Sequence, residues 1–176
     1  MNDYDDVLER FAFTADQSDV ASQPIVKTTM AFLAQFRLHQ SNTLAVSLSG
    51  GVDSMVIAQI LVALRGVGLL PPTCRIIALH INYMNRPEST REAECVEQWC
   101  NSSHIEYHVR TVCEVTRGVT DRNAYEKISR DIRYGFYREA MGLVNAGCPT
   151  ETHVHGIMFG HHIGDIQENV ISNVMR

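Results

Sequence analysis

A short glycine-rich segment, Ser49–Ser54, carries residue types that could bind a phosphate group. It follows an apolar run and precedes a helical pattern, so in an open α/β sheet it would lie at the carboxyl end of a strand. The adjacent Gly50 and Gly51 let backbone N–H groups approach an anion without a Cβ in the way. The helix N-terminus adds partial positive charge, and the hydroxyls of Ser49 and Ser54 add donors. The segment therefore predicts a site for phosphate or pyrophosphate.

Asp53 indicates how such a phosphate would be bound. A bare phosphate would repel this carboxylate, so its presence points to a Mg²⁺ ion between the two groups. The Walker A alternative does not fit, because it needs Gly-Lys and the two lysines, Lys27 and Lys127, follow Val26 and Glu126. A plain alternative stays open, in which a serine caps an ordinary turn between a strand and a helix.

Four segments together resemble the PP-loop ATP pyrophosphatases, which cleave ATP between its α and β phosphates. Residues Ser49–Ser54 resemble the SGGxDS signature of that superfamily. Three further segments are similar to its tRNA(Ile)-lysidine synthetase branch: His80-Ile81-Asn82 with Arg86–Ser89, the set Glu126, Arg130, Arg133 and Tyr134, and Gly160–Asn169. They follow the order of the family from Thr43 to the C-terminus.

The resemblance implies an adenine nucleotide alpha-hydrolase-like fold that uses ATP and Mg²⁺. The nucleotide would be bound by Ser49, Gly50, Gly51, Val52, Asp53, Ser54, His80 and His161. Catalytic roles would fall to Asp53, Asp165, Arg130 and Arg133. The metal ion would be held by Asp53 and Asp165.

The sequence departs from the family pattern at several positions. Gly164 precedes Asp165 where the family has paired acids, so one carboxylate is missing, and Ile166 and Asn169 replace Gln and Thr. Cys113 stands alone where the related 2-thiocytidine enzymes have Cys-x-x-Cys, which argues against sulfur transfer that depends on a cluster.

The helical pattern at 124–146 has two faces. The stripe that we expect to face the core holds Ile128, Ile132, Phe136 and Ala140. The opposite side holds Glu126, Arg130, Arg133 and Tyr137. The arginines there could clamp a phosphate, with Glu126 orienting Arg130. The plain alternative is a solvated face with ordinary surface ion pairs.

Several polar residues near the C-terminus allow more than one role. No cysteine pair or helical His-x₃-His supports a zinc site, so we expect His153 and His155 to pack at a strand and His161 and His162 to line the site. Asp165 and Glu168 have the spacing of a capping box. For Asp165, capping and active-site work both stay open, while Glu168 fits capping.

Strand and helix patterns alternate from Thr43 onward. Strands are expected at 43–48, 75–82, 105–112 and 152–160, and helices at 25–38, 54–66, 88–101, 124–146 and from 165. This rhythm predicts an α/β fold, a doubly wound parallel sheet in a Rossmann-like three-layer sandwich. We expect an acidic tail or helix at 1–22 and a PP-loop ATP-binding domain at 23–176, truncated at its C-terminus because the last helical pattern is still running.

Charge is concentrated at the N-terminus. The 176-residue chain has a formal net charge of −5, and residues 1–20 contain six acids and one base. The remainder is neutral, so only the stretch 110–138, with seven bases and four acids, is a candidate contact for tRNA. No apolar run is long enough to span a membrane, and no leader peptide is visible. We expect a cytoplasmic protein with reduced cysteines; the sequence indicates no oligomeric state.

The leading functional hypothesis is an ATP-dependent ligase that adenylates a nucleobase carbonyl of tRNA and releases pyrophosphate. An amine, lysine by resemblance, would then displace AMP. Two alternatives stay open: a nucleotide-binding module without turnover, and a PP-loop enzyme that thiolates or forms amides on another substrate.

Overall fold

The computed structural model describes residues 17–35, 37–38, 43–147, 149, 153–154 and 156–160. The helices within these ranges are α2 (Gln17–Ser22), α3 (Pro24–Gln35), α4 (Val52–Gly66), α5 (Ser89–Ser102) and α6 (Arg122–Asn145). The strands are β1 (Thr43–Ser47), β2 (Arg75–Asn82), β3 (Glu106–Thr111) and β4 (Ile157–Phe159).

The four strands form one parallel sheet in the order β3-β2-β1-β4. Val46 in the central strand β1 lies opposite Ala78 of β2 and Met158 of β4. The chain moves outward from β1 to β2 and β3, and then crosses to β4 on the other side of β1. Open α/β sheets bind ligands outside the carboxyl ends of the strands at such a reversal. The predicted fold class, a doubly wound parallel α/β sheet, is confirmed.

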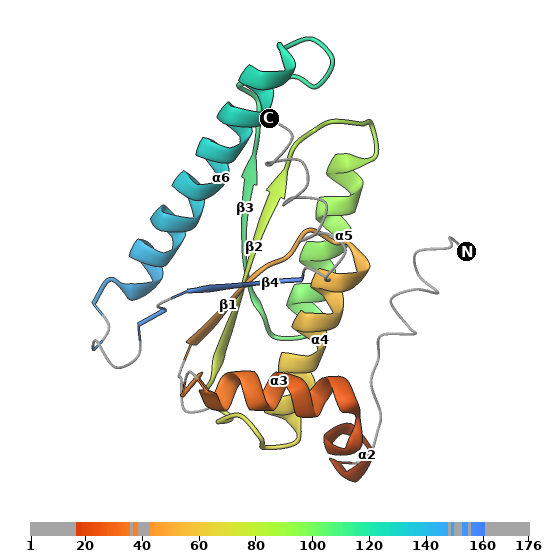
Figure 1. Cartoon of the computed structure of the whole chain (residues 1–176), viewed down its shortest axis with the longest axis vertical. Coiled ribbons are helices and arrows are strands. Elements are labelled where there is room, and N and C mark those ends of the chain that lie inside the picture. Colours follow the sequence, from red (N-terminus) through yellow and green to blue (C-terminus); the bar gives the residue numbers. More distant parts are fainter. Residues whose placement is uncertain are drawn as a thin grey trace, which may run out of the picture.

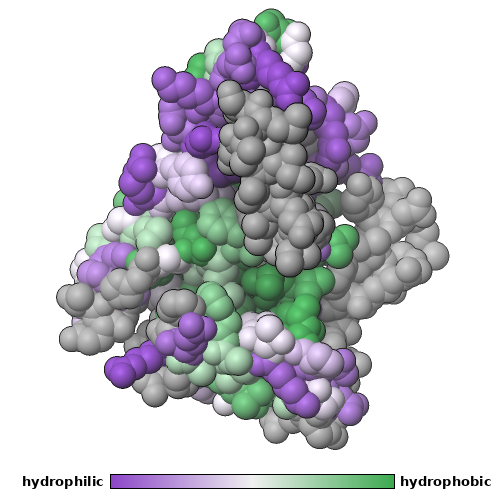
Figure 2. All heavy atoms as spheres, in the orientation of Figure 1, coloured by the Kyte–Doolittle hydropathy of each residue, from purple (hydrophilic) through white to green (hydrophobic). Residues whose placement is uncertain are grey.

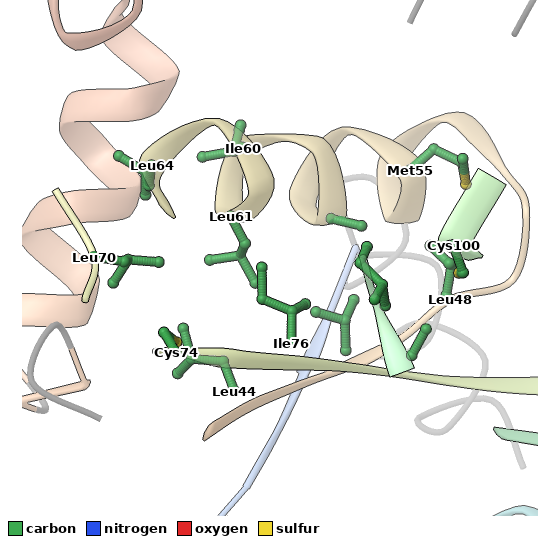
Figure 3. Close-up of a cluster of buried hydrophobic side chains, with 14 of the residues drawn as sticks. Leu44, Leu48, Met55, Ile60, Leu61, Leu64, Leu70, Cys74, Ile76 and Cys100 are labelled. Carbon is green, nitrogen blue, oxygen red and sulfur yellow. The ribbon is translucent and has the colours of Figure 1, made fainter. Parts of the chain in front are cut away.

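Helices cover both faces of the sheet, with α4 and α5 on one side and α6 on the other (Figure 1). Successive residues of a strand point to opposite faces, so an apolar strand such as β1 contributes to two cores. On the α4 face, Leu61 of the helix and Ile76 of β2 point toward one another (Figure 3). On the α6 face, Ile77 and Leu79 of β2 pack in one cluster with Ala140.

The predicted bounds agree with the structure most closely at β2, which spans residues 75–82 as expected. Helix α4 begins at Val52, two residues earlier than predicted, because Gly51 already occupies the N-cap position. Strand β4 covers 157–159 instead of the predicted 152–160. The helix expected from residue 165 lies outside the described residues.

The predicted core face of α6 is only partly right: Ala140 is buried and Phe136 packs against the same cluster, but the N-terminal half of the stripe is displaced. Ile128, placed on that face, is 37% exposed, whereas Ser129, Tyr137 and Val144 are buried. Helix α6 passes the end of β1, where the Tyr137 hydroxyl lies 2.6 Å from Ser47 Oγ. A tyrosine can be buried without penalty when its hydroxyl has a hydrogen-bond partner. The contact with Ser47 therefore allows Tyr137 to lie on the buried face of α6, where the apolar pattern alone did not place it.

Helix α2 lies within the segment expected to be an acidic tail or helix. Its Val20 is only 1% exposed and belongs to the core cluster on the α4 side of the sheet. This part of the segment therefore packs with the body of the protein. No helix among the described residues is long and apolar enough to cross a membrane.

A pocket of about 700 Å³ lies between α3 and the edge strand β4. Its lining includes Ile25 and Phe32 of α3 and Ile157 and Phe159 of β4. Apolar side chains gather across the middle of the face in Figure 2, where Figure 1 shows α3 and β4. No residue of the segment 49–54 lines this pocket, so it is distinct from the glycine-rich loop.

Candidate functional site

The segment predicted to bind phosphate forms the loop between β1 and α4, at the carboxyl end of the central strand. Gly50 has φ +83°, a left-handed conformation that side chains with a Cβ rarely adopt. A Cβ on Gly50 would also lie 3.1 Å from Cγ2 of Val96 in α5. The backbone conformation therefore favours glycine at this position, and the close approach of α5 leaves little room for a side chain.

Two serine hydroxyls hold the loop in shape. Ser54 is buried, and its Oγ donates to the Gly51 carbonyl at 2.9 Å and accepts from the Ser49 amide at 3.2 Å. The two hydroxyl oxygens, on Ser49 and Ser54, lie 3.0 Å apart. The Ser49 Oγ also accepts from the Gly51 amide at 3.2 Å. The Ser54 hydroxyl thus stabilises the conformation of the loop. From the sequence we had expected this hydroxyl to donate to a bound anion.

The N-terminus of α4 faces the loop without a side-chain cap. The N-cap residue is Gly51, which has no side chain that could accept a hydrogen bond from the amides of the first turn. The amides of this turn have no partners within the helix, and they concentrate the positive end of the helix dipole. Val52 and Asp53 are exposed there. The turn therefore offers amide donors and one carboxylate side by side.

His80 stabilises the backbone directly before the loop. It is buried on β2, and its Nδ1 lies 2.7 Å from the carbonyl oxygen of Leu48, the residue before Ser49. Because a carbonyl can only accept, Nδ1 carries the proton. Burial lowers the pKa of His80 below its ordinary value, which favours the neutral ring. His80, predicted to bind the nucleotide, thus contacts the backbone directly before the loop and the ring of Tyr107.

Arg133 lies at the carboxyl end of β2. Its Nε donates to the hydroxyl of Tyr83 at 2.8 Å, and its guanidinium carbon lies 5.7 Å from the centroid of the same ring. A stacked and hydrogen-bonded guanidinium is held in one orientation. The cation is therefore fixed near the strand ends.

Arg130, one turn before Arg133 on α6, is exposed and makes no hydrogen bond or ion pair with a described residue. The expected contact with Glu126 is not what the structure shows. Glu126 Oε1 instead accepts from Arg122 Nε at 3.2 Å. The Glu126 carboxylate thus pairs with Arg122, four residues before it, and Arg130 has no partner among the described residues.

Gly160 brings the end of β4 against the first turn of α4. A Cβ on Gly160 would lie 2.5 Å from the carbonyl carbon of Asp53 and 2.6 Å from Cα of Ser54, and closer still to the Ser54 nitrogen. Only glycine fits such a gap. The predicted site residues His161 and Asp165 follow Gly160 in the chain, and they lie outside the described residues, as do His155, His162 and Glu168.

These features make up a candidate anion site at the topological switch point of the sheet. The glycine-rich loop and the uncapped first turn of α4 offer backbone donors, and the Asp53 carboxylate is the kind of ligand that a divalent cation would take. Among the described residues, no group of three or more histidine, cysteine, aspartate or glutamate side chains could hold a metal ion. Of the two predicted metal ligands, Asp53 lies in the first turn of α4 and Asp165 lies outside the described residues.

Sequence reasoning missed two residues of the site. Tyr83, which holds Arg133, directly follows β2, so its position at the carboxyl edge of the sheet was a usable signal. Tyr137 was assigned to the face opposite the core, yet it is 4% exposed and contacts the end of β1. No local pattern distinguishes it from the exposed Tyr134.

Comparison with known proteins agrees with this geometry. A family model described as a PP-loop domain matches residues 22–176. The chain is 33% identical over 132 residues to a tRNA(Ile)-lysidine synthase of Nitratidesulfovibrio vulgaris, a match that covers 74% of this chain and 34% of that protein. It is 24% identical over 139 residues to the bifunctional protein TilS/HprT of Listeria monocytogenes, covering 79% of this chain and 20% of that protein.

The chain thus spans about a third or less of the length of these curated relatives. Among solved structures, it resembles the U34-tRNA thiolase NcsA of Methanococcus maripaludis with a TM-score of 0.51 and 16% identity. That match covers 98% of this chain and 50% of the thiolase. A likeness at this identity concerns the fold, which agrees with the parallel sheet described above.

Proposed function

This chain belongs to the PP-loop domain family, and we propose that it is the ATP-activating part of a tRNA-modifying ligase. In the proposed reaction, a nucleobase carbonyl of tRNA is adenylated with release of pyrophosphate, and lysine then replaces AMP. Support comes from the relatives, which include proteins named tRNA(Ile)-lysidine synthase. The single observation that carries the ATP part is the uncapped N-terminus of α4 behind Gly50 and Gly51.

The loop residues 49–54 would bind the β and γ phosphates through backbone amides. Negative charge on these phosphates complements the helix N-terminus, and the glycines leave room for close approach. Asp53, together with Asp165, would hold Mg²⁺, which supplies charge screening for the polyphosphate when it is bound. His80 would not contact the phosphates; it would hold the Leu48 carbonyl in place and so position the start of the loop.

The proposed chemistry is a pair of displacements. The nucleobase carbonyl oxygen attacks the α phosphorus, the bond from that phosphorus to the bridging oxygen breaks, and pyrophosphate leaves. The lysine amine then attacks the activated carbon, its C–O bond to AMP breaks, and the nitrogen loses a proton. Arg133, fixed by Tyr83, and Arg130 would stabilise the charge that develops on the phosphate oxygens.

Two further assignments belong to the same proposal. His161 and Asp165 would line the site, because they follow closely after Gly160, which lies against the first turn of α4. Exposed bases of the stretch 110–138, among them Arg117, Lys127 and Arg138, would contact tRNA phosphates. These contacts would position the tRNA without reading its sequence.

The test uses the Asp53→Asn variant with ATP, Mg²⁺, lysine and tRNA, and measures pyrophosphate release. Loss of the carboxylate removes a metal ligand, so release should fall by about 100-fold or more, while the circular dichroism spectrum stays unchanged. Asp19→Asn makes the same change on an exposed position of α2 and should leave release unaffected.

Equal pyrophosphate release by Asp53→Asn and the wild-type chain would contradict the assignment of the loop. If the wild-type chain binds ATP but releases no pyrophosphate with any tRNA, the ligase proposal is wrong and a binding module without turnover is the better description.

A further inference from the structure

Strand β3 forms the open edge of the sheet on the side away from β4. Within the described part of the chain it pairs only with β2, so alternate backbone N–H and C=O groups of its six residues point outward. None of these residues is buried. An exposed edge of this length is a template for pairing with another strand unless the protein blocks it.

The side chains of β3 sort into two faces. Glu106, His108 and Arg110 share the face that bears α6, and the Glu106 carboxylate contacts His108 Nε2 at 2.9 Å. Tyr107 and Val109 share the α5 face, where the Tyr107 hydroxyl donates to the Ala93 carbonyl at 3.2 Å. Val109 is apolar and yet 47% exposed. The strand thus presents an ordered charge pattern on one face and an uncovered apolar side chain on the other.

We propose that β3 pairs with the β3 strand of a second copy of this chain, antiparallel and centred on His108. A twofold axis at this residue places Glu106 opposite Arg110 of the second copy, and Arg110 opposite Glu106. On the other face it places Val109 opposite Tyr107 of the second copy, which would cover its exposed side chain. The two four-stranded sheets would then form one continuous sheet.

The charges favour this register over the one centred on Val109. Opposite charges directly across antiparallel strands stabilise the pair, and like charges destabilise it. Centring the twofold on Val109 would instead place the basic Arg110 opposite His108 with no acid between them. The register centred on His108 pairs both ionised residues of the strand with opposite charges.

Each of these charges already has a partner within the chain. Glu106 accepts from Arg75 at 2.5 Å, and Arg110 donates to Glu114. These side chains are 37–45% exposed, so the local pairs contribute little on their own. A carboxylate can accept several hydrogen bonds, so a contact with the second copy would add to the local pairs without replacing them.

Charged side chains on an edge strand can also serve to prevent pairing. The two roles differ in their response to charge reversal, which can be followed by sedimentation velocity of the 176-residue chain. Glu106→Arg and Arg110→Glu each place like charges across the proposed interface and should weaken self-association by about tenfold or more. The double variant E106R/R110E restores opposite charges and should restore the dimer.

An equimolar mixture of the two single variants gives the sharpest result. Each variant alone should self-associate more weakly than the wild type, but in the mixture every like-charge contact becomes an opposite-charge contact, so a mixed dimer should form. Lys27→Glu on α3 and Asp131→Arg on α6 change exposed charges elsewhere and should leave the dimer intact. Thermal unfolding by circular dichroism verifies that each variant is folded, and Glu106→Gln with Arg110→Gln replace any reversal that unfolds the chain.

Three results would overturn the proposal: a wild-type chain that stays monomeric at high concentration, single variants that dimerise as well as the wild type, or no recovery in the double variant and the mixture. A dimer that ignores these changes would use another surface. The experiment involves no nucleotide, so its outcome is independent of the proposed ATP chemistry.

Discussion

Gly160, at the end of β4, lies directly against the first turn of α4. Replacing it with alanine would force a Cβ to within 2.6 Å of Cα of Ser54, against backbone atoms that cannot move aside cheaply. We expect Gly160→Ala to destabilise the protein by about 1–3 kcal/mol, as overpacking does. It should also weaken ATP binding, because the displaced turn carries the amides of the proposed anion site. Urea unfolding and nucleotide titration measure the two effects.

Gly142 provides the matched control for this substitution. It lies within α6, and a Cβ there would meet nothing within 4 Å. Alanine is a better helix former than glycine, so Gly142→Ala should stabilise the protein by about 0.5–1 kcal/mol and leave ATP binding unchanged. If Gly160→Ala were as stable as the wild type and bound ATP equally well, the close approach of β4 to α4 would not matter to the site.

At the scale of elements, the hydrogen bond between Ser47 and Tyr137 joins α6 to β1. Ser47 lies two residues before the glycine-rich loop, and the Tyr137 ring also packs edge-on against Phe159 of β4 at 5.9 Å. Burial raises the pKa of Tyr137, so its hydroxyl stays protonated and can donate. Arg133 lies one turn earlier on α6. The hydrogen bond between Ser47 and Tyr137 therefore also ties the helix that carries Arg133 to the strand that leads into the loop.

We expect Tyr137→Phe to destabilise the protein by about 1–2 kcal/mol, because the half-buried Ser47 hydroxyl loses its partner. In a double-mutant cycle, Ser47→Ala and Tyr137→Phe should show a coupling energy of about 1 kcal/mol. Urea unfolding of the wild type, both single variants and the double variant measures it. Tyr134→Phe removes a hydroxyl from a half-exposed ring and should change stability by less than about 0.5 kcal/mol. Additive effects of the two substitutions would show that the hydrogen bond does not hold α6 in place.

The contact between Ser47 and Tyr137 also separates the elements that could be predicted from the sequence from those that could not. Strand β2 and the loop 49–54 were predictable because continuous apolarity and adjacent glycines are local signals. The orientation of α6 was not, because it depends on a contact between Ser47 and Tyr137, 90 positions apart. The closeness of Gly160 to α4 is likewise a property of the assembled sheet and leaves no trace in the residues around it.

At the scale of the whole molecule, the candidate site is built on the central strand of the sheet. β1 is covered on both faces, with Leu44 and Val46 in one core and Ala45 in the other. His80 belongs to the neighbouring strand β2 and links the core to the loop through the Leu48 carbonyl. Protonation of a group in this position is therefore coupled to unfolding of the whole domain.

This coupling predicts how stability depends on pH. Burial lowers the pKa of His80 in the folded protein, whereas the unfolded chain has an ordinary value of about 6.5. The contribution of neutral His80 is fully present above about pH 6.5, and it is lost as the pH falls toward the folded pKa, because the unfolded state then binds a proton that the folded state does not. The free energy of unfolding should thus decrease by up to about 1.4 kcal/mol per pH unit in this range.

Urea unfolding between about pH 7.5 and about pH 5.5 tests this expectation in the wild type and in His80→Asn. The asparagine amide keeps a donor for the Leu48 carbonyl but does not titrate, so the variant should lose less stability over this range. His104→Asn, at an exposed position, should keep the wild-type slope. A His80→Asn variant with the same slope as the wild type would mean that other groups cause the acid sensitivity, and that the loop does not depend on a neutral histidine beneath it.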